Sequence, residues 1–117
     1  MNNATKERVE EFLKDFKAKA AVFGITYKDD RGKNFNALSI LDITPKSRDE
    51  FLLSLIIDDY SQGPLNEDWH GAKAMWVFGK TIKNIEVYIK ICIVEQTGGT
   101  ICVSFHEAAH PMNYPLK

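Results

Sequence analysis

The segment EVYIKICIVE, residues 86–95, constrains the fold more than any other part of the chain, because apolar and polar side chains alternate along it. Every second position carries a β-branched side chain that falls on one side of an extended strand: Val87, Ile89, Ile91 and Ile93. The positions between them fall on the other side: Tyr88, Lys90 and Cys92. This pattern predicts a strand of an antiparallel sheet that has one face covered by helices and the other accessible.

Two further strands are expected beside this one, over residues 75–81 and 100–106. The connections between the three are short, which predicts an antiparallel meander. In the last strand, the apolar positions are expected on the covered face of the sheet: Ile101, Val103 and Phe105. The remaining positions are then expected on the accessible face: Cys102, Ser104 and His106.

The register of the last two strands follows from these faces, because residues directly opposite each other in a sheet share a face. A three-residue loop within QTGGT, with a glycine at the position of positive φ, leaves two registers open. One places His106 opposite Tyr88, and the other places it opposite Lys90. Either way, the opposed Cα atoms lie roughly 4.5–5.5 Å apart.

Helices are expected ahead of the strands: residues 5–21, residues 35–42, and a segment from Pro45 to about Ile57. Thr44 is a good N-cap for the last of these, and the proline after it suits the first helical position. Residues 22–30 are expected to form a short strand or an extended segment, and residues 58–74 a long irregular loop. The predicted class is α+β, with N-terminal helices packed on one face of a small antiparallel sheet.

Composition sets further limits on the chain. Its 117 residues with 44% hydrophobic content predict one soluble domain with a single core. No apolar run approaches the ~20 residues that a membrane span needs, and the N-terminal segment is polar, so neither a membrane partner nor a secretory signal is expected. The 2 cysteines are expected to be thiols in a reducing cytoplasm. A net charge of −1 argues against strong non-specific binding to nucleic acid, and no direct DNA partner is expected.

The string HEAAH, residues 106–110, matches the zinc-peptidase signature H-E-x-x-H. That chemistry needs both histidines on one helical face, with Glu107 as the base. Residues 100–105 alternate as a strand and Pro111 follows His110 at once, so a helix here would begin and end within about one turn. None of the residues after His110 is His, Asp, Glu or Cys. We therefore expect neither a metal nor a cofactor.

His106, Tyr88 and Lys90 are expected to converge on the accessible sheet face. Such a set can cleave a phosphodiester without a metal: a general base takes the proton of a ribose 2′-hydroxyl, cations stabilise the charged phosphorane, and an acid protonates the leaving 5′-oxygen. Histidine suits either proton-transfer role near neutral pH. The alternative is an ordinary solvated sheet face, on which Tyr, Lys, Ser and His are common.

Lys80 joins this set under only one of two turn geometries. With a two-residue loop in IKNIE, Trp76 and Phe78 are core residues and Lys80 follows them. With a three-residue loop, Lys80 lies beside Tyr88 and can contribute to catalysis.

Candidate RNA-binding residues lie outside these strands. The charged loop KDDRGKN offers Arg31 and Lys33 to phosphates, although such charges can equally be solvated. Tyr60, in the long loop, could stack on a base or could cap the core instead.

Four stretches of the chain together resemble a known family: DDYSQGP, MWVFGK, EVYIKI and ICVSFHEAAHPMNYP. They are similar to the MqsR family of toxins from bacterial type II toxin–antitoxin systems, within the RelE-like group of mRNA-cleaving ribonucleases. The similarity covers roughly residues 50–117. It implies that residues 1–117 form a single RelE/MqsR-like domain. It also implies a metal-independent endoribonuclease that cleaves mRNA, arrests growth and is neutralised by a cognate antitoxin protein.

The resemblance assigns some residues and leaves others without a match. The family's strand tyrosine and the lysine after it match Tyr88 and Lys90, and a lysine that follows its last strand falls on His106. Of two further family positions, a lysine falls on Leu55 and a glutamine falls near Val77, and neither residue can do the same chemistry. A non-catalytic protein-binding module with this fold is therefore the alternative function.

Overall fold

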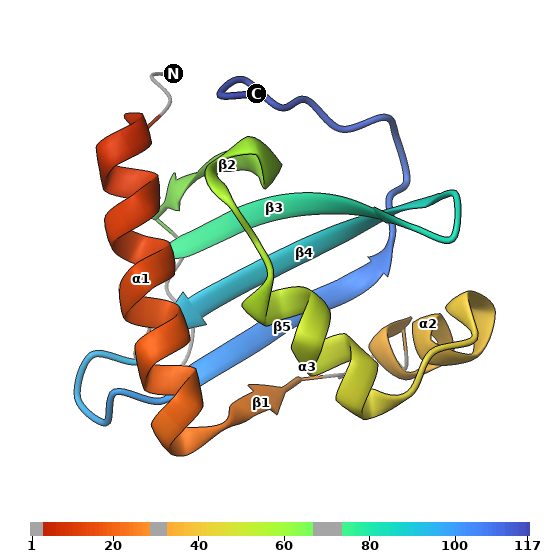
Figure 1. The fold of residues 1–117 in the computed structure, drawn as a ribbon, viewed down its shortest axis with the longest axis horizontal. Coiled ribbons are helices and arrows are strands. Elements are labelled where there is room, and N and C mark those ends of the chain that lie inside the picture. Colours follow the sequence, from red (N-terminus) through yellow and green to blue (C-terminus); the bar gives the residue numbers. More distant parts are fainter. Residues whose placement is uncertain (1–3, 29–32, 67–73) are drawn as a thin grey trace.

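The computed structural model describes residues 4–28, 33–66 and 74–117, and it has an α+β fold (Figure 1). Three α-helices, a short 3-10 helix and five strands are described along these ranges. In chain order they are α1 (Lys6–Phe23), β1 (Ile25–Tyr27), α2 (Lys33–Leu41), α3 (Pro45–Leu53), η1 (Ile57–Asp59), β2 (Tyr60–Leu65), β3 (Met75–Ile82), β4 (Ile85–Ile93) and β5 (Thr100–Glu107).

The strands form one sheet in the order β1-β5-β4-β3-β2. Strands β3, β4 and β5 make the predicted antiparallel meander. The prediction of a purely antiparallel sheet was wrong, because β1 pairs with β5 in parallel. The prediction of a loop over residues 58–74 was wrong for Tyr60–Leu65, which pairs with β3 as strand β2. This pairing changes register twice, so β2 lacks the regular alternation that would have indicated a strand.

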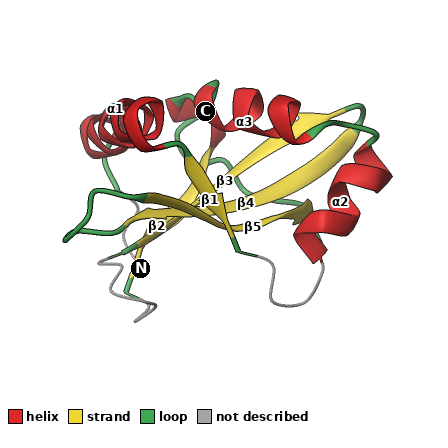
Figure 2. Ribbon diagram, turned by 90° about the horizontal axis from the view of Figure 1, so that it is seen from below, coloured by secondary structure: helices red, strands yellow, loops and turns green. Residues whose placement is uncertain are grey.

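Helices α1 and α3 lie on the same side of the sheet (Figure 2), and α2 contacts β5. We call the covered side, which carries Phe78, Ile89 and Phe105, the helix face. The other side, which carries Gly79, Tyr88 and His106, is the groove face. The main core lies between the helices and the helix face, and its helical members come from all three helices: Val9, Leu13, Phe16, Ala37, Leu41 and Leu52.

Threonine caps begin two of the helices. The Oγ1 of Thr5 accepts a hydrogen bond of 3.2 Å from the N–H of Arg8 at the start of α1. The Oγ1 of Thr44 accepts one of 3.1 Å from the N–H of Ser47, with a proline at the next position, as predicted for α3. Helix α3 ends at Leu53, earlier than predicted.

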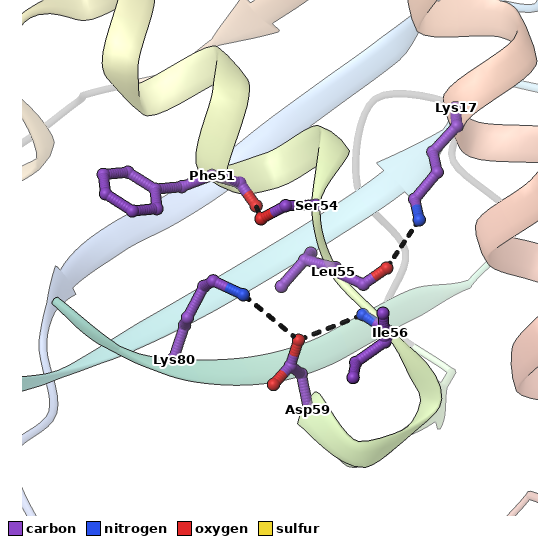
Figure 3. Close-up of polar contacts among 7 residues, drawn as sticks. All are labelled: Lys17, Phe51, Ser54, Leu55, Ile56, Asp59 and Lys80. Atoms are coloured by element: carbon purple, nitrogen blue, oxygen red, sulfur yellow. Dashed lines mark hydrogen bonds and ion pairs between the residues drawn. The ribbon is translucent and has the colours of Figure 1, made fainter.

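Two side chains bind the backbone of the chain that follows α3 (Figure 3). The Lys17 ammonium of α1 donates a hydrogen bond of 2.6 Å to the carbonyl oxygen of Leu55, and the N–H of Ile56 donates one of 3.0 Å to Asp59. These bonds satisfy backbone groups that an extension of α3 would have paired within the helix. Leu55 is fully buried in the main core although it lies outside any helix.

A β-bulge in β5 changes the faces predicted for the first half of that strand. Lys90 pairs with Ser104, whereas the next residue of β4 pairs with Cys102, so Val103 is left over. Cys102 therefore lies in the main core, and Ile101 and Val103 pack in a smaller cluster. The prediction had these three residues on the opposite faces and was wrong, because alternation alone does not reveal an extra residue.

The central strand should carry much of the stability. Ile89→Ala should lower the free energy of unfolding by about 2–5 kcal/mol, because Ile89 is fully buried and its truncation leaves a cavity. Ile40→Ala makes the same change at a position that is 60% exposed, and should alter the free energy by no more than about 0.5 kcal/mol. Urea unfolding of both variants measures the difference, and equal losses would contradict the burial of β4.

Candidate functional site

The groove face holds a groove of about 450 Å³. Strands β4 and β5 contribute Tyr88 and His106 to its lining, and β2 contributes Ser61 and Gln62. Another wall comes from residues 108–113, which follow β5. These residues belong to the C-terminal segment, residues 108–117, which runs back from the end of β5 toward β2 (Figure 1). The groove is thus built from parts of the chain that lie far apart in the sequence.

Tyr88 and His106 are direct cross-strand neighbours. This pairing confirms one of the two predicted registers and excludes the one that put Lys90 opposite His106. The two rings are stacked, with centroids 5.4 Å apart and planes inclined by 16°. Both side chains are half-buried and line the groove, so a ligand in the groove can reach them.

A hydrogen bond orients the ring of His106. Its Nδ1 lies 2.9 Å from the backbone carbonyl oxygen of Glu107. Because a carbonyl oxygen can only accept, Nδ1 carries the proton in the neutral ring and Nε2 holds the lone pair. Nε2 is therefore the atom of His106 that can take a proton from a ligand, which is the role of a general base.

Lys90 shares the groove face with this pair, since it follows Tyr88 by two residues on the same strand. It is flanked by Ser104 on β5 and by Val77 on β3. The prediction that Tyr88, Lys90 and His106 occupy one sheet face is confirmed. Lys90 can supply positive charge beside the groove, and Tyr88 and His106 line the groove itself.

A two-residue turn joins β3 to β4. Its residues, Lys83 and Asn84, both have positive φ angles, of 51° and 69°. Tight hairpins of this length favour such angles. This is the turn geometry under which Trp76 and Phe78 were expected in the core, and both belong to the main core.

The same turn places Lys80 on the helix face. Lys80 pairs with Val87, and its ammonium lies 3.6 Å from the carboxylate of Asp59 (Figure 3). Gly79, not Lys80, stands opposite Tyr88. The prediction of Lys80 as a catalytic residue beside Tyr88 was wrong, because that geometry needed a three-residue turn.

Tyr60 belongs to the core and cannot stack on RNA. It is fully buried, and its ring lies edge-on to the rings of Trp76 and Phe78. Its hydroxyl donates to the carbonyl oxygen of Gly63 and accepts a hydrogen bond of 3.1 Å from the N–H of Ala4. The predicted RNA-binding role was wrong, and the alternative, that Tyr60 caps the core, is confirmed.

The two charged candidates for RNA binding cannot be placed. Arg31 lies outside the described residues. Lys33 is the first residue of α2, but its side chain also lies outside the described part of the chain. Contact between these residues and RNA phosphates stays a prediction.

Most of the groove could not be predicted from the sequence. Gln62 and Asn113 are exposed residues that line it, and His110 lines it as well. The C-terminal segment has neither helical nor strand periodicity, so no pattern indicated that it folds back over the sheet. Its contacts with Glu86 and Gly79 each depend on a single residue, and such contacts leave no signal in a single sequence.

His106 does not belong to a zinc-peptidase helix. Strand β5 extends through His106 to Glu107, so HEAAH begins in a strand and lacks the helical face that this chemistry needs. Within residues 4–28, 33–66 and 74–117, no group of three or more His, Cys, Asp or Glu side chains is placed to hold a metal ion. In the same ranges, no helix is long and apolar enough to cross a membrane.

Leu55 and Val77, where the resemblance to the MqsR family fails, are both fully buried. Their side chains therefore contribute to packing and not to a polar site. In comparisons with known proteins, no family model, no curated protein and no solved structure matches the chain. The chemistry of the groove is accordingly inferred from its own residues.

Tyr60→Phe tests the structural role of the buried hydroxyl. The change should cost about 1–3 kcal/mol of unfolding free energy, because the buried groups on Ala4 and Gly63 lose a hydrogen-bond partner. Tyr88→Phe is the matched control: it removes the same atom from a half-buried ring and should change stability by no more than about 0.5 kcal/mol. Thermal unfolding measures both variants. A Tyr60→Phe protein as stable as wild type would refute the assignment.

Proposed function

We propose that this protein is a metal-independent endoribonuclease that cleaves mRNA, and that it is the toxin of a toxin–antitoxin system. The observation that carries the chemistry is the stacked pair of Tyr88 and His106 in the groove, with Nε2 of His106 oriented as a proton acceptor. The toxin role is supported by the sequence resemblance of residues 50–117 to the MqsR family. The proposed partners are mRNA and a cognate antitoxin protein, and the proposed location is the cytoplasm.

In the proposed reaction, Nε2 of His106 removes the proton of a ribose 2′-hydroxyl, and the 2′-oxygen attacks the adjacent phosphorus. The bond between phosphorus and the 5′-oxygen of the next nucleotide breaks, and the imidazolium returns its proton to that oxygen. The products are a 2′,3′-cyclic phosphate and a 5′-hydroxyl end. Tyr88 holds the imidazole by stacking and offers a hydroxyl to a phosphate oxygen, while Lys90 supplies positive charge to the phosphorane.

A non-catalytic protein-binding module is the second candidate, and exposed apolar side chains favour it. Among the described residues, five of them lie on or next to the helices: Val22 (75% exposed), Phe23 (63%), Ile40 (60%), Ile56 (54%) and Leu53 (40%). Where exposed apolar side chains form one contiguous patch, they often mark a surface that binds another protein. A module that works through these residues needs no chemistry in the groove, so removal of His106 would leave its function unchanged.

Induced expression in bacteria separates these candidates. Wild type should arrest growth and leave new mRNA 5′ ends at specific sites, each with a 5′-hydroxyl. His106→Ala should reduce cleavage of purified RNA by about 10²–10⁴-fold, the range that loss of a general base produces. Tyr88→Phe keeps the ring and its stacking, and should reduce cleavage by a smaller factor.

His110→Ala is the matched control, because His110 also lines the groove but is exposed and outside the stacked pair. It should retain most of the cleavage, and circular dichroism should show that all three variants are folded. If cleavage is lost in His110→Ala but kept in His106→Ala, the general base is His110 of the C-terminal segment and not His106. No arrest and no cleavage by folded wild type would reject the ribonuclease and favour the binding module.

A further inference from the structure

The C-terminal segment is attached to β4 mainly through one residue, Glu86. The backbone carbonyl of Glu86 accepts a hydrogen bond of 2.8 Å from the N–H of Ala108, where the segment begins. Its carboxylate accepts one of 2.9 Å from the N–H of Met112 and one of 2.6 Å from the hydroxyl of Tyr114. Three bonds from one residue thus fix the path of the wall that faces Tyr88 and His106.

A glycine makes room for this attachment. A Cβ atom on Gly79 would lie 2.7 Å from Sδ of Met112 and closer still to the hydroxyl of Tyr114. Since Gly79 stands opposite Tyr88, the segment lies directly beside the stacked pair. Burial and the hydrogen bond to Glu86 raise the pKa of Tyr114, so its hydroxyl stays protonated at neutral pH and keeps donating.

Two exposed amide side chains line the groove and come from different walls. Gln62 belongs to β2, and Asn113 belongs to the C-terminal segment between the two residues bound by Glu86. An amide offers both hydrogen-bond donors and an acceptor, and can therefore pair with the edge of a nucleobase. A phosphate offers only acceptors, so it would pair with the NH2 group of each amide and leave the amide carbonyl oxygen without a partner. The groove volume of about 450 Å³ lies within the usual range for small-molecule sites.

We infer that the groove is a nucleobase subsite, in which Gln62 and Asn113 read the edge of a base next to the cleaved phosphodiester. This inference rests on the proposed ribonuclease function and adds its substrate specificity. Proteins read single-stranded RNA by stacking unpaired bases on aromatic or histidine rings and by hydrogen-bonding their edges. Here the stacked pair and the two amides provide both kinds of contact. Glu86 and Gly79 act as positioning residues, because they hold the wall that carries Asn113.

The test combines cleavage with binding. Wild type is given a pool of randomised single-stranded RNA, and the base preference at the cut sites is determined. The same preference is measured as binding of 2′-deoxydinucleotides to wild type, which cannot cleave them because they lack the 2′-hydroxyl. Gln62→Ala and Asn113→Ala should each reduce discrimination between bases by roughly ten-fold in both measurements, as expected for loss of a bidentate base contact. Gln96→Ala removes an exposed amide in the β4–β5 connection and should change nothing.

Glu86→Ala provides a second, independent variant. It removes both side-chain bonds to the C-terminal segment and should weaken base discrimination while Asn113 itself is intact. Glu50→Ala, at an exposed position of α3, is its matched control.

The outcomes separate the two proposals. Wild-type cleavage with unchanged preference in the Gln62 and Asn113 variants would overturn the subsite and keep the ribonuclease. Selective dinucleotide binding that these variants abolish, without any cleavage by wild type, would overturn the ribonuclease and keep the subsite. Neither cleavage nor binding would overturn both.

Discussion

The two-sided environment of β4 is the constraint on which the rest of the structure depends. On its helix face Val87, Ile89 and Ile91 are fully buried, and each such side chain contributes about 1.5–3 kcal/mol when it leaves water. Ile89 pairs with Phe105, another fully buried residue, so a slip of β5 by one position would move that phenylalanine to the groove face. The same pairing sets Tyr88 against His106. The stacked pair is therefore held by hydrophobic burial on the far side of the sheet, and not by its own modest interaction.

Much of the architecture could be predicted because it follows from repeated patterns. Alternation in β4 predicted the helix face, and the capping residues predicted where α3 begins. The shared face of Tyr88, Lys90 and His106 also followed from alternation near the end of β5. What could not be predicted depends on single residues. One extra residue, Val103, reverses the faces before it, and two residues with positive φ decide where Lys80 points. The hydrophobic pattern of the sequence indicates neither the bulge nor the length of the turn.

The C-terminal segment shows the same limit more strongly. Nothing in MNYPLK has the period of a helix or a strand, yet the segment supplies a wall of the groove because Glu86 and Gly79 accommodate it. An acidic residue at a strand start and a glycine within a strand are common enough to pass unnoticed in a sequence. The role of these two residues becomes clear only in the structure, where the C-terminal segment contacts Glu86 of β4 and Gly79 of β3. The candidate site could thus be half predicted: its reactive pair follows from the sheet, while its shape follows from contacts between distant residues.

The proposed chemistry must also fit the electrostatics of the chain. With a net charge of −1, the protein lacks the general positive field by which many proteins hold nucleic acid through its phosphates. Among the described residues, Lys90 is the lysine that lies near the stacked pair on the groove face. Lys80 lies on the other side of the sheet, where its ammonium contacts Asp59. A ribonuclease with this net charge gains little affinity from a general attraction to RNA phosphates, so contacts inside the groove become important for holding the substrate. Stacking on rings and hydrogen bonds to amides are contacts of that kind, and they depend on the base. On this argument, weak general attraction to RNA and selection of particular cut sites are two consequences of one charge distribution.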